Sequence, residues 1–257
     1  MMNIHYLYFL SVLLMGHLIF DPLLKFYTWH EQPDKQRSRW LWPLIISLAI
    51  ALTSYAVIAL WTLWFLPLAI FVTHMSVYLF WRSMSNDSIG SLALEEGLHL
   101  LFALLVARLF SSGQVLAAVG ALSLTGLVYK MLIILAGFLT VTLLGAVVIG
   151  AWVKPFQVQF DQANNVKHGY NRQSGFKDGG KMIGVLERAL IYVFIMVGQP
   201  AAIGFLIAAK SILRFGEVKD SQDRMNVEYI IIGTMMSFLF AVVVGYCIRF
   251  FINSFHF

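Results

Sequence analysis

The sequence predicts an all-α protein, a polytopic transmembrane helical bundle with about seven membrane segments and a range of six to eight. Of its 257 residues, 60% are hydrophobic and only 12% are charged. The mean hydropathy of +0.78 therefore lies outside the range of ordinary soluble domains. The apolar residues gather in runs close to the about 20 residues that a helix needs to cross a bilayer. Lys and Arg gather between these runs, as they do in cytoplasmic loops.

The expected membrane segments follow from these runs in chain order. They lie near residues 4–25, 41–60, 62–81, 92–110, 130–153, 186–209 and 228–252. The first run lacks a basic leader and a small-residue cleavage site, so we expect it to be retained as a spanning helix. The stretch 114–127 is short and interrupted by glycine, which fits either a half-helix or the start of a kinked fifth segment.

The loops between these segments divide the chain into three parts. We expect a front membrane bundle at 1–153, a basic cytoplasmic loop at 154–185 and a C-terminal membrane helix pair at 186–257. Basic residues place the first, third and fifth loops in the cytoplasm of a bacterial inner membrane, with the N-terminus outside. The loop 210–227 is also basic and breaks this rule if 186–209 crosses fully. In the alternative, Gly198-Gln199-Pro200 bends that segment into a re-entrant hairpin that returns both basic flanks to one side.

The net charge of +5 resides in these loops and indicates contact with anionic membrane lipid rather than with nucleic acid. The loops 154–185 and 210–227 are candidate docking sites for a soluble cytoplasmic partner, with a purely solvated role as the alternative. The lone Cys247 excludes an internal disulfide and a metal site made of several thiolates.

Ionisable residues inside three of the apolar runs are the main functional signal. His17, Asp21 and Lys25 follow one another at four-residue spacing, which aligns them along one helix face. Glu95 and His99 repeat the carboxylate-imidazole spacing, and Glu96 reaches His99 at three residues. Such groups are costly at membrane depth and persist with a partner, a water cavity or a function. The simplest interpretation is a local ladder in which Lys25 extends towards the membrane interface.

A metal site is the sharper hypothesis. Two helices that each present a carboxylate and an imidazole from one face can build a site in a bundle core, with His74 as a third imidazole. Three imidazoles with one or two carboxylates suit Zn²⁺, Fe²⁺ or Mn²⁺ and leave a position for water. The metal ligands are then expected among His17, Asp21, His74, Glu95 and His99, with Asp21 and Glu95 as ligands or general base. Each histidine alone is equally compatible with a hydrogen bond to a carbonyl or hydroxyl, and no organic cofactor is indicated.

These motifs also carry a family resemblance. The runs HLIFDPLLKF, THMSVYLFWRS and ALEEGLHLLFALLVA resemble a bacterial polytopic membrane family of uncharacterised function. Its members carry HxxxDxxxQ in the first helix, a T-H-x-x-x-D-like element and a D-Q-x-x-H-like element, and their extended forms are similar to this chain's C-terminal part. This sequence has Glu95 for an Asp, Lys25 for a Gln and Tyr78 where the second Asp is expected, so no acidic role is inherited at Tyr78. The residue types are more loosely similar to membrane-bound metal-dependent hydrolases.

Three classes of function follow from the sequence. The first is a metal-dependent hydrolase that acts on a lipid or lipid-linked substrate. The second is a transporter or channel in which the same buried residues move cations or protons. The third is a non-enzymatic membrane subunit that anchors a soluble partner, with the polar cluster supplying helix-packing specificity. The first two functions require the buried polar cluster to face a cavity. The third requires only that the polar groups of the cluster pair with one another.

Overall fold

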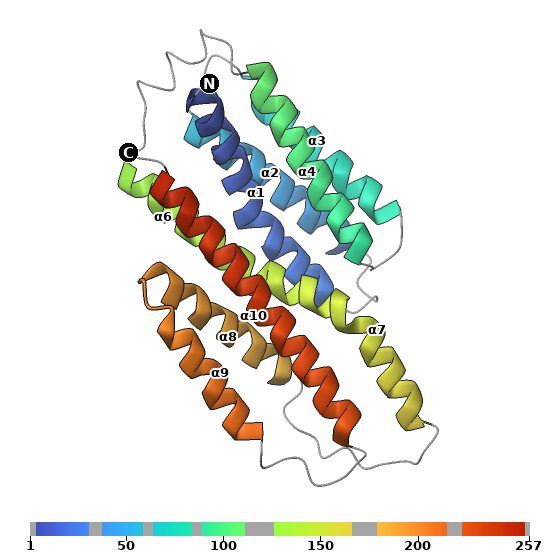
Figure 1. Ribbon diagram of the computed structural model, residues 1–257. Coiled ribbons are helices and arrows are strands. Elements are labelled where there is room, and N and C mark those ends of the chain that lie inside the picture. Colours follow the sequence, from blue (N-terminus) through green and yellow to red (C-terminus); the bar gives the residue numbers. More distant parts are fainter. Residues whose placement is uncertain are drawn as a thin grey trace. The chain divides into compact units, whose positions relative to one another are not determined.

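A computed structural model shows the chain to be helical throughout the part that it describes, which confirms the all-α prediction (Figure 1). The described residues are 4–30, 38–58, 64–83, 89–110, 126–165, 179–214 and 223–254. The chain divides into two compact units, which meet between Leu139 and Thr140. All the ionisable residues singled out from the sequence fall in the first unit.

The first unit is built around its N-terminal helix. It contains α1 (Ile4–His30), α2 (Ser38–Ile58), α3 (Leu66–Ser83), α4 (Ile89–Phe110) and α6 (Gly126–Leu139). Helix α1 packs against α2, α4 and α6, while α3 packs against α2 and α4. A Cβ at Gly16 would collide with the Ser54 hydroxyl, so the absence of a side chain lets α1 and α2 approach closely. The ionisable residues of α1 therefore lie at the centre of this unit.

The second unit is organised by its C-terminal helix. It contains a π-helical turn η1 (Thr140–Leu144), α7 (Gly145–Asn165), α8 (Gly179–Met196), α9 (Ala201–Arg214) and α10 (Asp223–Ser254). Helix α10 packs against α7, η1 and α8. The buried Arg188 donates hydrogen bonds to the carbonyl oxygens of Val141 (2.8 Å) and Thr142 (3.0 Å), and to Ser237 Oγ (3.0 Å). A π-helical turn disturbs the regular backbone ladder, and this guanidinium satisfies the carbonyls of that turn.

The segment predicted at 186–209 is a helical hairpin. Helix α8 ends in a Schellman motif, in which Gly198 N–H bonds to Ile195 O and Gln199 N–H bonds to Phe194 O. Gly198 has φ of +76°, a left-handed conformation that glycine adopts without strain. Lys210 Nζ of α9 lies 2.6 Å from Glu187 Oε2 in the middle of α8, so the two helices lie side by side. The stretch expected as one membrane segment at 186–209 is thus two helices, with the bend at Gly198-Gln199-Pro200 that the hairpin alternative placed there.

Two helical stretches, Lys130–Val158 and Ile230–Asn253, are long and apolar enough to cross a membrane. Shorter apolar helical stretches occur at Leu10–Leu23, Leu41–Ala56 and Ala201–Ile212. The polar segment 154–185 was predicted as a loop, but its ends are helical, because α7 continues to Asn165 and α8 begins at Gly179. The stretch 114–127 lies almost wholly outside the described residues, as do most of 154–185 between these helices and the middle of 210–227.

Candidate metal centre

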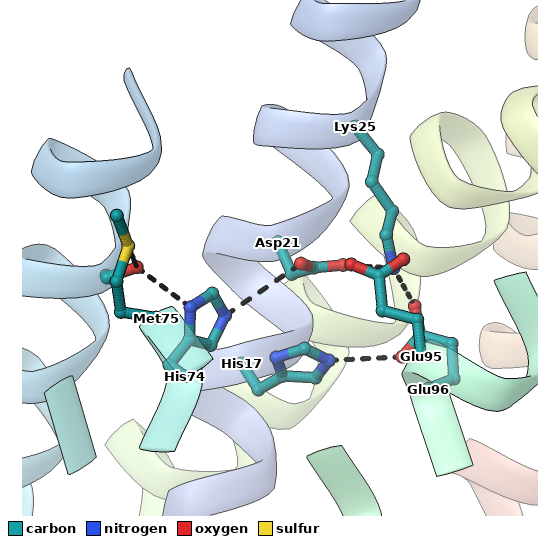
Figure 2. Close-up of polar contacts among 8 residues, drawn as sticks. His17, Asp21, Lys25, His74, Met75, Glu95 and Glu96 are labelled. Carbon is teal, nitrogen blue, oxygen red and sulfur yellow. Dashed lines mark hydrogen bonds and ion pairs between the residues drawn. The ribbon is translucent and has the colours of Figure 1, made fainter. Parts of the chain in front are cut away.

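The ionisable residues of three helices converge on one buried cluster in the first unit. Helix α1 contributes His17, Asp21 and Lys25 from successive turns of one face. Helix α3 contributes His74, and α4 contributes Glu95 and Glu96 (Figure 2). Helix α4 also contributes His99. The predicted convergence of the polar faces is confirmed, since all five residues proposed from the sequence as metal ligands are buried and belong to this cluster.

The three imidazoles form the first half of the cluster. The ring centroids of His17 and His99 lie 4.3 Å apart, those of His74 and His99 4.5 Å and those of His17 and His74 5.5 Å. One ring nitrogen from each can be chosen so that all three lie within 4.8 Å of one another. The three histidines are therefore a group that could hold one metal ion, whose bonds to imidazole nitrogen are about 2.0–2.1 Å long for zinc.

Each of these imidazoles has at least one buried ring nitrogen without a hydrogen-bond partner. His17 Nδ1, His74 Nε2 and both nitrogens of His99 are in this state. A buried polar atom normally finds a partner, because leaving it unsatisfied costs about 1–3 kcal/mol. The unsatisfied atoms are lone-pair or N–H nitrogens that face one another, which fits a set of metal ligands.

The remaining nitrogens of two rings are oriented by neighbouring side chains. His17 Nε2 lies 3.1 Å from Glu96 Oε2; a carboxylate only accepts, so this nitrogen carries the hydrogen and Nδ1 keeps its lone pair. Ser47 Oγ lies 2.9 Å from His74 Nδ1 and also donates to Met75 Sδ at 3.9 Å. Ser47 thus holds the His74 ring through Nδ1. Metal-binding histidines are typically held by such outer partners.

His74 Nε2 then faces another acceptor. It lies 3.9 Å from Asp21 Oδ1, and neither atom has a hydrogen-bond partner. This separation is too long for a hydrogen bond. It is close to the sum of a metal–nitrogen and a metal–oxygen bond, each about 2.0–2.2 Å. An ion between the two atoms would satisfy both.

The second half of the cluster is ionic. Lys25 Nζ lies 2.8 Å from Asp21 Oδ2 and 3.1 Å from Glu95 Oε2, and it also pairs directly with Glu96. The expectation that Lys25 extends to the interface is therefore wrong, because the side chain is only 5% exposed. When all four groups are ionised, three carboxylates face one ammonium and leave two uncompensated negative charges. Buried charge without compensation is costly, so a divalent cation would balance this cluster.

A cavity of about 40 Å³ adjoins the imidazoles. His17, His74 and His99 form its polar wall together with Thr73, while Leu13, Leu14, Ile50, Ile70, Phe102 and Val106 supply most of the rest. This volume exceeds the roughly 10–15 Å³ that one water requires. The cavity can therefore hold a water-sized polar group against the histidines, and the rest of its wall is mainly apolar.

Three participants were not identified as site residues from the sequence. Lys25 and Glu96 were recognised only as local neighbours on their own helices, and Ser47 was not considered. The signal for Ser47 was its position seven residues before Ser54 in an otherwise apolar run, which places both on the inner face of α2. Tyr78, which stands where the resembled family has an acid, is buried.

The donor set fits a divalent metal on three grounds: nitrogens without partners, oriented tautomers and excess negative charge. The described residues contain three groups of three side chains, and within each group the ligand atoms lie within 4.8 Å of one another. The groups are the three imidazoles, then Asp21 with Glu95 and His99, and then His17 with Asp21 and Glu96. No family model, curated protein or solved structure matches the chain.

Proposed function

We propose that the chain is a multi-pass membrane protein whose first unit holds one divalent metal and hydrolyses a lipid or lipid-linked substrate. The observation that carries this proposal is the set of partnerless ring nitrogens of His17, His74 and His99 beside three carboxylates that share one lysine. The metal classes favoured by imidazole and carboxylate ligands are Zn²⁺, Fe²⁺ and Mn²⁺.

In this proposal the three histidines are the ligands that would hold the metal, and Asp21 is the group that would move a proton. A metal with three protein ligands supplies a Lewis acid and a bound water of lowered pKa. Asp21 Oδ1 faces the imidazole set, 3.9 Å from His74 Nε2, while Oδ2 is held by Lys25. Asp21 is thus positioned either as a fourth ligand or as the general base for a water beside the histidines. Glu95, also paired with Lys25, is the second candidate for that role.

The substrate class is proposed from the cavity and from the outer surface. The cavity beside the histidines is otherwise mainly apolar, so a substrate that enters it brings hydrocarbon close to the polar wall. Large apolar side chains such as Leu44, Ile45, Leu48 and Leu52 are exposed along α2, as expected of a surface that faces lipid rather than water. Access from the bilayer would suit a lipid or lipid-linked substrate.

The multi-pass topology is proposed from the apolar helices together with the hairpin of α8 and α9. The contact between Lys210 of α9 and Glu187 of α8 shows that α9 turns back along α8. The basic segments that flank the hairpin then lie on one side of the membrane, as the charge distribution requires. Reporter fusions within 84–88 and 166–178 are expected to report the cytoplasm, and fusions that report opposite sides would overturn this orientation.

A proton or cation path is supported less well than a metal site. Contacts join His17 to Glu96, Glu96 to Lys25, Lys25 to Asp21 and Asp21 to His74, and the His74 ring lies 5.5 Å from the His17 ring. Among the described residues, these five side chains therefore form a ring. A conducting path has to continue towards both faces of the membrane, so a ring of contacts favours a fixed site.

The decisive experiment is metal analysis of protein purified without chelator. We expect about one bound Zn²⁺, Fe²⁺ or Mn²⁺ per chain, lost in His99→Ala and retained in His168→Ala, a histidine of the polar segment 154–185. Metal-loaded protein in vesicles of bacterial lipid should release soluble products, and His99→Ala should not. Absence of metal, together with a melting temperature that added metal leaves unchanged, would overturn the proposal. Bound metal without product release would leave transport or scaffolding as the function.

A further inference from the structure

The ammonium of Lys25 has the surroundings of a metal ion. Oxygens of three carboxylates contact it: Asp21 Oδ2 at 2.8 Å, Glu95 Oε2 at 3.1 Å and Glu96 Oε1. These carboxylates come from two helices, α1 and α4, and the Asp21 and Glu95 residues are only 1% and 2% exposed. Lysine is almost never buried unless it is paired. Here it is paired several times over, in a buried site rich in hard oxygen donors.

The arrangement of three carboxylate oxygens around the Lys25 ammonium is also the arrangement that would bind a hard divalent cation. Carboxylates suit Mg²⁺, Ca²⁺ and Mn²⁺, and Lys carries a compact ammonium charge that is not confined to one geometry. The ammonium supplies a single positive charge, whereas the three carboxylates offer three negative charges when ionised. The carboxylate half of the cluster is therefore undercompensated by its own lysine.

A separate observation indicates that these carboxylates are arranged towards a ligand. Asp21 and Glu95 form a group with His99, and Asp21 and Glu96 form a group with His17, each with ligand atoms within 4.8 Å. His99 is 7% exposed, and neither of its ring nitrogens has a hydrogen-bond partner. This unsatisfied side chain lies among the carboxylates that hold Lys25, so the ligand-like arrangement extends beyond the three imidazoles.

We propose that the Lys25 ammonium occupies a second cation position, so that the natural protein binds one divalent metal at the histidines instead of two. Removal of the ammonium would open a site made of Asp21, Glu95 and Glu96, completed by His99 or His17. The built-in cation keeps the carboxylates in place at any metal concentration, because a covalently attached charge cannot dissociate. The inference has two parts. The part that concerns the ion at the histidines rests on the proposed function, and the part that concerns the second cation position rests on the contacts of Lys25.

The test is the Mn²⁺ stoichiometry of the full chain in detergent, measured by elemental analysis after desalting. Lys25→Gln keeps a side chain of similar length without the charge and is expected to bind about one more ion per chain than the natural protein. Lys25→Arg keeps the charge and is expected to bind the same number as the natural protein. Lys210→Gln removes a lysine that pairs with a single carboxylate, Glu187, and is also expected to leave the number unchanged.

The outcomes separate this inference from the proposed function. A natural protein without metal overturns the proposed function, and a gain of one ion in Lys25→Gln still supports the second position. Equal stoichiometry in folded Lys25→Gln and natural protein at millimolar Mn²⁺ overturns the inference. If Lys25→Gln does not fold, Lys25→Gln/Glu95→Gln removes one positive and one negative charge together. This double variant should gain an ion through Asp21 and Glu96, and the same number as in the natural protein overturns the inference.

Discussion

His99 is expected to reduce the stability of the metal-free protein, and His99→Leu should therefore stabilise it. Both ring nitrogens are buried without a hydrogen-bond partner, and each such atom costs about 1–3 kcal/mol. Leucine is apolar and of comparable size, so the substitution removes these costs without opening a large cavity. It also removes the ring contacts with His17 and His74, at 4.3 and 4.5 Å between centroids, which offsets part of the gain. We expect a net stabilisation of about 1–2 kcal/mol, because aromatic pairs contribute roughly 0.5–1.5 kcal/mol.

The assay is thermal unfolding in detergent with a chelator present. A change of 1 kcal/mol shifts the Tm of a protein of this size by roughly 2–4 °C, so His99→Leu should raise it by about 2–8 °C. His74→Leu is the matched control, because it also removes an unsatisfied nitrogen but leaves Ser47 without its partner at 2.9 Å, and it should gain less. With Zn²⁺ added, only the natural protein should gain stability. A lower Tm for His99→Leu in chelator would refute the reasoning and assign His99 a structural role.

Four further predictions follow from other contacts. Ser47→Ala should weaken metal affinity about tenfold in a chelator competition, because His74 loses its orienting partner, whereas Ser54→Ala should not. Metal affinity should fall as the pH is lowered, since imidazole binds metal only when neutral; a zinc titration at several pH values checks this. Arg188→Met should lower unfolding stability by at least about 3 kcal/mol, because two carbonyls and a hydroxyl lose their donor. Gly198→Ala should cost about 1–2 kcal/mol at φ of +76°, whereas Gly204→Ala, with open space around it, should not destabilise; melting curves measure both.

Features that depend on neighbours within one helix were predictable. His17 with Asp21 and Glu95 with His99 each occupy one helix face because four residues complete about one helical turn, and the structure places these pairs as expected. The break at Gly198-Gln199-Pro200 was also visible, because glycine accepts a left-handed conformation and proline cannot continue the helical hydrogen bonds. The lengths of the apolar runs located the helices to within several residues. The exception is α7, which continues as a polar helix beyond the end of its apolar run.

The composition and local spacing of the sequence thus determined an all-helical chain with buried imidazoles and carboxylates on defined faces. Which faces meet was decided only by the tertiary structure. The pairing of Glu96 with His17, of Ser47 with His74 and of Lys25 with Glu95 joins residues 79, 27 and 70 positions apart. Local periodicity carries no information on such pairs, because they depend on how α1, α2, α3 and α4 pack and on close approach at positions such as Gly16. The same packing turned Lys25 from an expected interfacial charge into the cation at the centre of three carboxylates, since buried charges are stable only where opposite charges surround them.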